Sequence, residues 1–179
     1  MEATQLLSKQ HRKVESLFRK LERKNPDAET LLTDLANDLA AHMAIEQEIF
    51  YPAVRNVDES LLLESYEEHA LAEVALKRLL ATDPQDDAFK ARVTALKELI
   101  QHHVKEEEEE LFPQVQKKLD EESLNELGKR MRKRFDEVVE AGFEAAVPRG
   151  FAKTSSDLSK RQFNSAGRTK SGKSSRRAA

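Results

Sequence analysis

The stretch HMAIEQEIFYP, residues 42–52, decides the fold together with its echo HVKEEEEELFP, residues 103–113. Aligned at their histidines, the two copies match in three further pairs of positions: Glu46 with Glu107, Tyr51 with Phe112, and Pro52 with Pro113. In each copy a glutamate follows a histidine by four residues. On a helix this spacing puts both side chains on one face, about 5–6 Å apart at Cβ. Two such pairs on two helices of one bundle predict a shared metal site.

Apolar residues recur at helical spacing on both sides of these copies. They predict a first helix over residues 3–24, ended by Asn25-Pro26, and a second from Asp27 to about residue 55, where Pro52 ends or kinks it. A third helix is expected from about Glu59 to residues 82–84, and a fourth from residues 86–87 to about Lys118. The second and third stripes are predicted to run Leu32, Leu35, Leu39, His42, Glu46, Ile49, Ala53 and Leu62, Tyr66, His69, Glu73, Leu76, Leu80.

Four helices with short connections indicate an all-α, up-down-up-down four-helix bundle. The first and third helices also resemble each other, as HRKVESLFRKL (residues 11–21) and HALAEVALKRL (residues 69–79), so the bundle is expected to be internally duplicated. Residues 121–146 predict an extra C-terminal amphipathic helix. The expected division is a bundle at 1–119, the additional helix at 120–147 and a disordered basic tail at 148–179.

The amino-acid composition indicates a helical protein and excludes several kinds of site. Charged residues make up 35% of the 179 residues and aromatic residues 6%, which suits a helical protein with a charged exterior. The chain has no cysteine, so disulfides, iron–sulfur clusters and thiolate-bound metals are excluded. The N-terminal residues lack the apolar run of a signal peptide, and no run approaches the length of a membrane span. We therefore expect a cytoplasmic protein.

The net charge of −3 conceals an asymmetry between the body and the tail. From Pro148 onward there are nine Lys or Arg and one acid, a net charge of +8, which leaves −11 for the preceding 147 residues. A basic tail of this kind predicts at most salt-sensitive, non-specific contact with nucleic acid or with acidic surfaces, including the body of the same chain.

Seven titratable side chains fall inside the apolar stripes of the predicted bundle: His11, His42, Glu46, His69, Glu73, His103 and Glu107. A buried carboxylate without a partner costs several kcal/mol. The stripes hold no Lys or Arg to neutralise these acids, whereas a metal centre would satisfy all seven groups together. The histidines lie at similar distances, within about one turn, from the chain reversals between antiparallel helices, so the seven side chains are expected to form one layer.

The donor set indicates which metal to expect. Imidazole and carboxylate without thiolate favour iron, manganese or zinc over copper(I). Seven ligands exceed the needs of a four-coordinate zinc ion, and two metals bridged by the two glutamates fit better. Ferritin-like di-iron proteins use Glu-x-x-His pairs, whereas here the histidine comes first and the spacing is four, which argues against that class.

These residues resemble the hemerythrin-like, or HHE cation-binding, domain: His11, His42-x-x-x-Glu46, His69 and His103-x-x-x-Glu107, over roughly residues 4–119. The resemblance implies two non-haem iron ions joined by an oxo or hydroxo bridge and by the carboxylates of Glu46 and Glu107. It further implies that His11 and His42 bind one iron and that His69 and His103 bind the other. Oxygen-carrying members have a histidine at the position of Glu73 and an aspartate five residues after the last histidine. The replacement of an imidazole by a carboxylate disfavours reversible oxygen carriage.

Three functions follow as alternatives. The first is a di-iron protein that binds or senses O2 or a related small oxidant, or responds to iron. The second is an enzyme that decomposes peroxide or reduces nitric oxide at the same centre, as in stress-response members. The third is a metal-free helical scaffold whose tail engages nucleic acid. The sequence does not separate carrier, sensor and enzyme, or establish the oligomeric state, although the helix over residues 121–146 could form a homodimer.

Two further side chains lie near the expected ligands. Glu15 follows His11 by four residues, as Glu73 follows His69, but Val14 already fills that position of the stripe. His102 is rotated by about 100° from His103 and is interpreted as a neighbour of the site. Both remain open as additional ligands.

Overall fold

The computed structural model describes residues 1–23 and 26–146, and all regular structure within these ranges is helical. The first pair of helices is α1 (Ala3–Leu21) and α2 (Ala28–Ile45), the latter continued by η1 (Glu46–Phe50) and α3 (Tyr51–Val54). The second pair is α4 (Glu59–Leu80) and α5 (Asp87–Glu106), the latter continued by η2 (Glu107–Leu111) and α6 (Phe112–Lys118). Two helices follow, α7 (Glu121–Ala141) and α8 (Phe143–Ala146). The predicted disorder from Pro148 lies outside the described residues.

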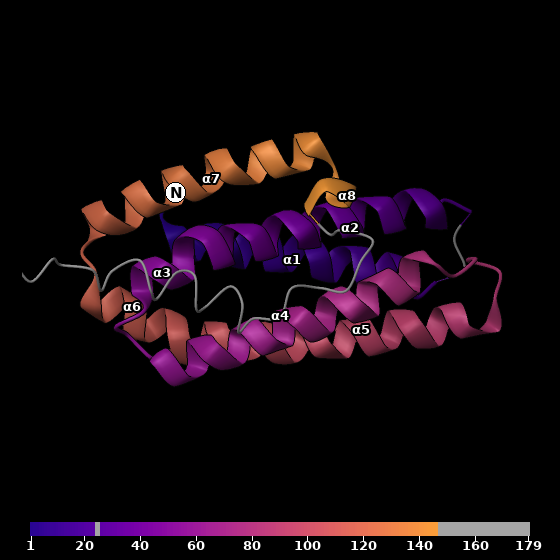
Figure 1. Ribbon diagram of the computed structural model, residues 1–179, viewed down its shortest axis with the longest axis horizontal. Helices are drawn as coiled ribbons and strands as arrows, with labels where there is room; N and C mark the ends of the chain where they lie inside the picture. The colour runs from indigo at the N-terminus through magenta and orange to yellow at the C-terminus, as the bar shows by residue number, and fades with distance from the viewer. Residues whose placement is uncertain (24–25, 147–179) are drawn as a thin grey trace, which may run out of the picture.

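The two pairs form the predicted up-down-up-down bundle (Figure 1). Within each pair the helices pack against each other, α1 on α2 and α4 on α5. The pairs are joined across the bundle by contacts of α1 with α5 and of α2 with α4. Acidic side chains cap three of these helices, since Glu2 accepts the N–H groups of Thr4 and Gln5, Asp58 accepts the N–H of Leu61, and Asp86 accepts the N–H of Ala88. The all-α fold class is confirmed.

The two long helices are each widened by one π-helical turn that begins at the glutamate of the His-x-x-x-Glu motif. The backbone N–H of Tyr51 donates to the carbonyl of Glu46, five residues earlier, and Phe112 N–H donates to Glu107 in the same way. A proline follows each turn, and its ring would clash with the carbonyl four residues before it in a regular helix. The wider turn accommodates the proline, so the helices continue to Val54 and Lys118.

The π turn of η1 also corrects one prediction. Beyond Glu46 the buried side chains are Phe50, Tyr51 and Val54, whereas the predicted stripe continued through Ile49 and Ala53. One extra residue in the turn rotates everything that follows by one position. The prediction assumed 3.6 residues per turn throughout and is therefore displaced by one residue after Glu46.

The core consists of two hydrophobic clusters arranged along the bundle. On α1, Leu6 and Leu7 belong to the first cluster and Val14 and Leu17 to the second. His11 lies between these two pairs in the sequence of the helix. The other helices repeat the pattern, with their buried histidine or glutamate at the junction of the two clusters. A polar layer therefore crosses the bundle between two apolar regions.

Helix α7 lies along α1 and α2, on the side of the bundle away from α4 and α5 (Figure 1). Five apolar side chains of this helix are buried in the first cluster: Leu124, Leu127, Met131, Phe135 and Val138. Gly128 permits the close approach, because a Cβ there would lie 2.5 Å from the carbonyl oxygen of Met1. The sequence predicted this helix but not its docking place.

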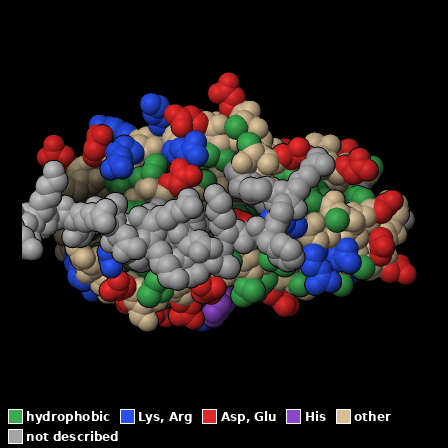
Figure 2. Space-filling view, in the orientation of Figure 1, with side chains coloured by type: hydrophobic (Ala, Val, Ile, Leu, Met, Phe, Trp, Pro, Cys, Tyr) green, Lys and Arg blue, Asp and Glu red, His purple; other side chains and the backbone are tan. Residues whose placement is uncertain are grey.

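Charged side chains of both signs are spread over the face in Figure 2, as the composition led us to expect. Among the described residues, no helix combines the length and the apolar character needed to cross a membrane.

Candidate metal centre

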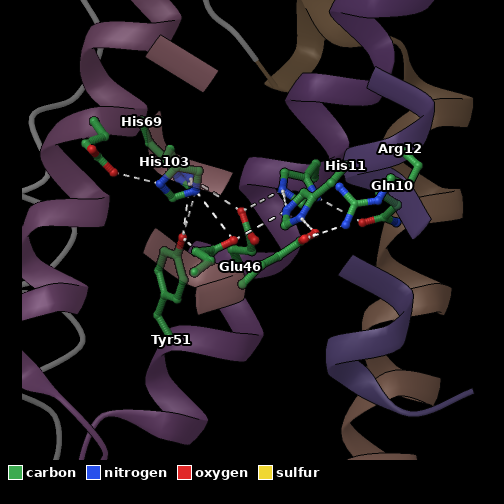
Figure 3. A network of polar contacts seen from close by, with 11 residues as sticks. Gln10, His11, Arg12, Glu46, Tyr51, His69 and His103 are labelled. Atoms are coloured by element: carbon green, nitrogen blue, oxygen red, sulfur yellow. Dashed lines mark hydrogen bonds and ion pairs between the residues drawn. The ribbon is translucent and has the colours of Figure 1, made fainter. Parts of the chain in front are cut away.

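Six of the seven predicted ligands meet in the polar layer between the two hydrophobic clusters (Figure 3). Their exposed fractions range from 0% for Glu46 to 5% for His42. They come from all four bundle helices and from the first residues of both π turns, and they are His11, His42, Glu46, His69, His103 and Glu107. The layer is therefore built by the whole bundle and is closed to solvent.

The four histidines form two pairs, one from each half of the bundle. The Nε2 atoms of His11 and His42 lie 3.1 Å apart, and those of His69 and His103 lie 3.0 Å apart. Figure 3 shows His11 on one side of the cluster and His69 with His103 on the other, with Glu46 between them. The ring nitrogens of each pair thus converge on one point in each half of the layer.

Each glutamate lies between the two histidine pairs. Oε2 of Glu46 is 3.2 Å from Nε2 of His42 and 3.4 Å from Nε2 of His69. Oε2 of Glu107 is 3.4 Å from Nε2 of His11 and 3.7 Å from Nε2 of His103. Both carboxylates therefore face a histidine of each half, which is the placement required of a group that bridges two cations.

The outer ring nitrogen, Nδ1, of every histidine has its own partner. Nδ1 of His11 is 2.8 Å from Glu108 Oε1, and Nδ1 of His103 is 2.7 Å from Glu68 Oε2. The other two pairs are His42 Nδ1 with Gln10 Oε1, at 3.0 Å, and His69 Nδ1 with Gln47 Nε2, at 3.0 Å. The oxygen acceptors at Nδ1 of His11, His42 and His103 orient each ring so that the lone pair of Nε2 points inward, as metal-binding histidines require. At His69 the partner is the amide N–H of Gln47, which donates to Nδ1.

The same partners make the protein-only arrangement unfavourable. With Nδ1–H of His11 and of His42 donated outward, these two neutral imidazoles, whose Nε2 atoms lie 3.1 Å apart, present two lone pairs and no proton to each other. Both carboxylate oxygens of Glu46 and Oε2 of Glu107 are buried and lack a hydrogen-bond partner. No Lys or Arg among the described residues lies within ion-pair distance of either glutamate. These unsatisfied acceptors are the groups that a bound cation would contact.

The pKa values of the layer reflect its burial and the closeness of its charges. Burial, followed by the charge of Glu107, raises the pKa of Glu46 well above its usual value. Burial would also raise the pKa of Glu107, but His103 and His11 hold it below its ordinary range. Burial lowers the pKa of His42 and His69. Both imidazoles are therefore neutral at neutral pH, the form that binds metal.

The structure does not bring the seventh predicted residue, Glu73, into the layer. Its carboxylate is partly exposed and lies 3.9 Å from the ammonium of Lys77. On α4 the buried positions after His69 are Ala72, Leu76 and Leu79, so Glu73 falls beside the stripe. After His69, both Ala72 and Glu73 satisfy a helical period of 3.6 residues. The helix buries the small Ala72 and leaves Glu73 partly exposed, because burial of a carboxylate is costly.

The two residues left open lie outside the layer. Glu15 is 3.7 Å from Arg19 on the surface of α1. His102 is 62% exposed and faces Glu68 and Glu106. Neither contributes a donor atom to the six-residue cluster.

Tyr51 is a further polar group in the centre. Its hydroxyl donates a 2.9 Å hydrogen bond to Glu107 Oε1 and lies 3.4 Å from Nε2 of His69. Burial and the charges of Glu107 and Glu46 raise the pKa of Tyr51, so the phenol keeps its proton. In the sequence Tyr51 follows Glu46 by five residues and aligns with Phe112 in the repeat. Its place opposite Phe112 in the repeat was the available signal that this hydroxyl is a distinct feature of one half.

A small cavity adjoins the layer on the side of the second hydrophobic cluster. Its volume is about 10 Å³, close to the minimum that holds one water-sized molecule. The four histidines form one wall, and the other walls are apolar: Val14, Leu39, Met43, Ile100 and Val104. The cavity can admit a small neutral molecule beside the ring nitrogens.

A buried His4Glu2 layer in a four-helix bundle defines a helical cation-binding protein. The comparison with known families agrees: the hemerythrin HHE cation-binding domain matches residues 2–115, and the chain belongs to this family.

One solved structure supports the same fold, that of an HHE cation-binding domain-containing protein from Mycobacterium kansasii, a homologue of Rv2633c. It superposes with a TM-score of 0.71 at 24% identity, over 79% of this chain and 89% of that one. A DNA nickase from the cyanobacterium Nostoc sp. is 31% identical over 119 residues. The matched region is 65% of this chain, which spans about a third of the nickase (34%).

Proposed function

We propose that the layer holds two iron ions, one at His11 and His42 and the other at His69 and His103, with Glu46 and Glu107 shared between them. The placement of each carboxylate between the two histidine pairs supports two cations, because one ion could use only one pair. Six imidazole and carboxylate donors suit iron and exceed the needs of one tetrahedral zinc. When bound, such a pair of irons supplies redox chemistry and open coordination positions.

The function that this site supports best is the binding or sensing of O2 or a related small oxidant. The cavity beside the four histidines carries this proposal. Its apolar walls favour small neutral molecules over anions, and its size admits no organic substrate. The buried layer also keeps bulk water away from the centre.

The first test is metal content with an optical spectrum of the full chain as purified, after dithionite, and after readmission of air. We expect two irons per chain and a near-ultraviolet oxo-to-iron band that bleaches on reduction and returns in air. One metal per chain, or zinc in place of iron, would overturn the proposal. Chelation should also lower the melting temperature, because a ligand bound only to the folded state stabilises it by mass action. An unchanged melting temperature would favour the metal-free scaffold.

Tyr51 favours a second function, the decomposition of peroxide or the reduction of nitric oxide. A buried phenol that keeps its proton can donate it to a substrate that approaches the centre. Rapid and repeated O2 evolution from peroxide, without loss of iron, would support turnover. Slow stoichiometric bleaching would leave binding or sensing as the function.

We further propose that the basic segment from Pro148 contacts nucleic acid without sequence preference. Its charge of +8 is the supporting observation, and the name of the Nostoc relative is consistent with contact to DNA. The test compares DNA binding by the full chain and by residues 1–148, at about 50 mM and about 200 mM salt. Affinity should fall steeply with salt in the full chain and be lost on truncation. Metal content should be equal in both, and binding retained by the truncated chain would refute the proposal.

A further inference from the structure

A second group of metal-ligand side chains lies on the surface beside His103. It consists of Glu68 from α4 with His102 and Glu106 from α5, and one donor atom from each lies within 4.8 Å of the others. Nε2 of His102 is 3.5 Å from Glu68 Oε1 and 3.3 Å from Glu106 Oε1. His102 is 62% exposed, so this group opens to solvent, unlike the buried layer.

Glu68 connects the surface group to the buried layer. While its Oε1 faces His102, its Oε2 accepts a hydrogen bond of 2.7 Å from Nδ1 of His103. One carboxylate therefore contacts a solvent-exposed imidazole and a buried one. A cation held at His102 would sit one side chain away from the layer.

The carboxylate that accepts from a histidine Nδ1 on the other side of the layer has a different surface partner. Glu108 accepts from Nδ1 of His11, and the guanidinium of Arg12 neutralises it at the surface. In the described part of the chain, the only basic groups within ion-pair distance of Glu68 and Glu106 are His102 and His103. Glu68 therefore has no permanently charged neighbour that would correspond to Arg12 beside Glu108.

Glu106 contributes a second observation at this group. Its Oε2 is buried and has no hydrogen-bond partner. The negative charges of Glu68, Glu64 and Glu110 act on the same carboxylate. Two carboxylates and one imidazole, without a fixed positive charge, are a donor set for a divalent transition metal.

We propose that Glu68, His102 and Glu106 form a surface site for a divalent cation such as Fe²⁺ or Mn²⁺, which passes ions to the buried layer. The ligands of that layer are at most 5% exposed, so an ion must be captured outside before it enters. Glu68 lies at the point of transfer, because it contacts both sites. Only the transfer of ions to the buried layer rests on the proposed function, and the surface site itself does not.

The first experiment counts Mn²⁺ bound to the full chain after the buried layer has been filled and excess metal removed. Free Mn²⁺ is measured by its electron paramagnetic resonance signal. The wild type should bind one more Mn²⁺ per chain than His102→Ala or Glu106→Gln. Glu98→Gln is the matched control, since it removes an exposed charge from the same helix, one turn earlier, and should retain the extra ion. Equal Mn²⁺ binding by the wild type and His102→Ala overturns the site.

The second experiment follows Fe²⁺ uptake by the metal-free full chain in a stopped-flow instrument. His102→Ala should lose the fast phase of uptake and still reach the wild-type metal content, because His102 is not a ligand of the buried layer. An unchanged rate overturns the transfer role even if Mn²⁺ binds. The two proposals also fail separately: zinc in the buried layer would refute the di-iron function, while the Mn²⁺ count would still decide the surface site.

Discussion

The two halves of the metal layer have nearly the same geometry and different surroundings. The histidine pair of α1 and α2 has its Nε2 atoms 3.1 Å apart, and the pair of α4 and α5 has them 3.0 Å apart. Beside the second pair, the Tyr51 hydroxyl lies 3.4 Å and 3.5 Å from the two Nε2 atoms. Beside the first pair, the ring of Phe112 stacks on His11 with centroids 6.0 Å apart and an angle of 8° between the planes.

Tyr51 and Phe112 occupy equivalent positions of the repeat, so the difference lies in the side chain and not in the backbone. Each follows a π turn and precedes a proline. An apolar ring shields one half, whereas a protonated phenol reaches into the other. Duplication therefore explains the symmetric ligand positions, and one hydroxyl makes the halves chemically distinct.

The halves also differ on the outside of the bundle. Helix α7 covers α1 and α2, where its apolar face completes the first hydrophobic cluster. The outer face of α4 has no such cover among the described residues, and Leu71 and Val74 are 58% and 49% exposed there. Packing on the covered half should therefore matter more for stability than the same kind of contact on the open half.

Glu46→Ala should remove a carboxylate that the two halves of the layer share, because Glu46 faces His42 in one half and His69 in the other. We expect the loss of at least one metal per chain. The melting temperature should fall as well, since a metal at 100 times its dissociation constant contributes about 2.7 kcal/mol. Elemental analysis and thermal unfolding check both effects. Glu48→Ala is the control, because Glu48 lies in the same π turn but pairs with Arg134 on the surface. Normal metal content in Glu46→Ala would refute the shared position.

Acidification should release the two metals one after the other, first from one half of the layer and then from the other. Burial opposes charge on His11, but hydrogen bonds to Glu107 and Glu108 raise its pKa in the metal-free protein, while burial lowers the pKa of His69. A metal must displace a proton below the pKa of its ligand, so its affinity falls first at the ligand with the higher pKa. Between about pH 8 and about pH 5, the metal at His11 should leave at the higher pH.

Metal content per chain at equilibrium, measured in small pH steps, checks this order. Two separate steps are expected. A single step that removes both metals would show that the difference between His11 and His69 does not govern release.

Gly128→Ala should destabilise the covered half without removing metal. The added Cβ would lie 2.5 Å from the Met1 carbonyl and force α7 away from the start of α1. Overpacking of this kind costs about 1–3 kcal/mol, and each kcal/mol lowers Tm by about 2–4 °C for a chain of this size. Leu71→Ala on the open half should change stability by no more than about 0.5 kcal/mol. Thermal unfolding of the two variants checks this prediction. Equal shifts in Tm would contradict the expected difference in stability between the covered half and the open half.

Sequence alone predicted the helices, the bundle and six side chains that meet in the layer, because each depends on periodicity within one helix. The position of Glu73 was not predictable in this way, since two sets of positions on α4 share the same period. The displacement after Glu46 depended on a π turn, whose only sequence signal is the following proline. Periodicity describes one helix at a time and assumes that its period is constant.

The outer partners of the histidines were also missed, for a different physical reason. Gln10, Glu68 and Glu108 each reach a histidine on another helix, so their roles depend on how neighbouring helices are rotated and shifted. No spacing within the chain encodes those contacts. The docking of α7 was not predictable for the same reason, because the role of Gly128 depends on its contact with the first residues of the chain, at the start of another helix.

Tyr51→Phe should have the smallest effect and should confine it to one half. The phenol contacts His69, His103 and the shared Glu107 but neither His11 nor His42, so both metals should remain bound at neutral pH. Loss of an outer partner of this kind weakens metal affinity by about tenfold or more. Only the second, lower-pH release step should therefore move, and it should move to higher pH. Tyr66→Phe removes a hydroxyl that donates to the Gln47 carbonyl outside the layer, and it should leave both steps in place. A shift of the first step in Tyr51→Phe would mean that the halves are coupled through Glu107 and do not act separately.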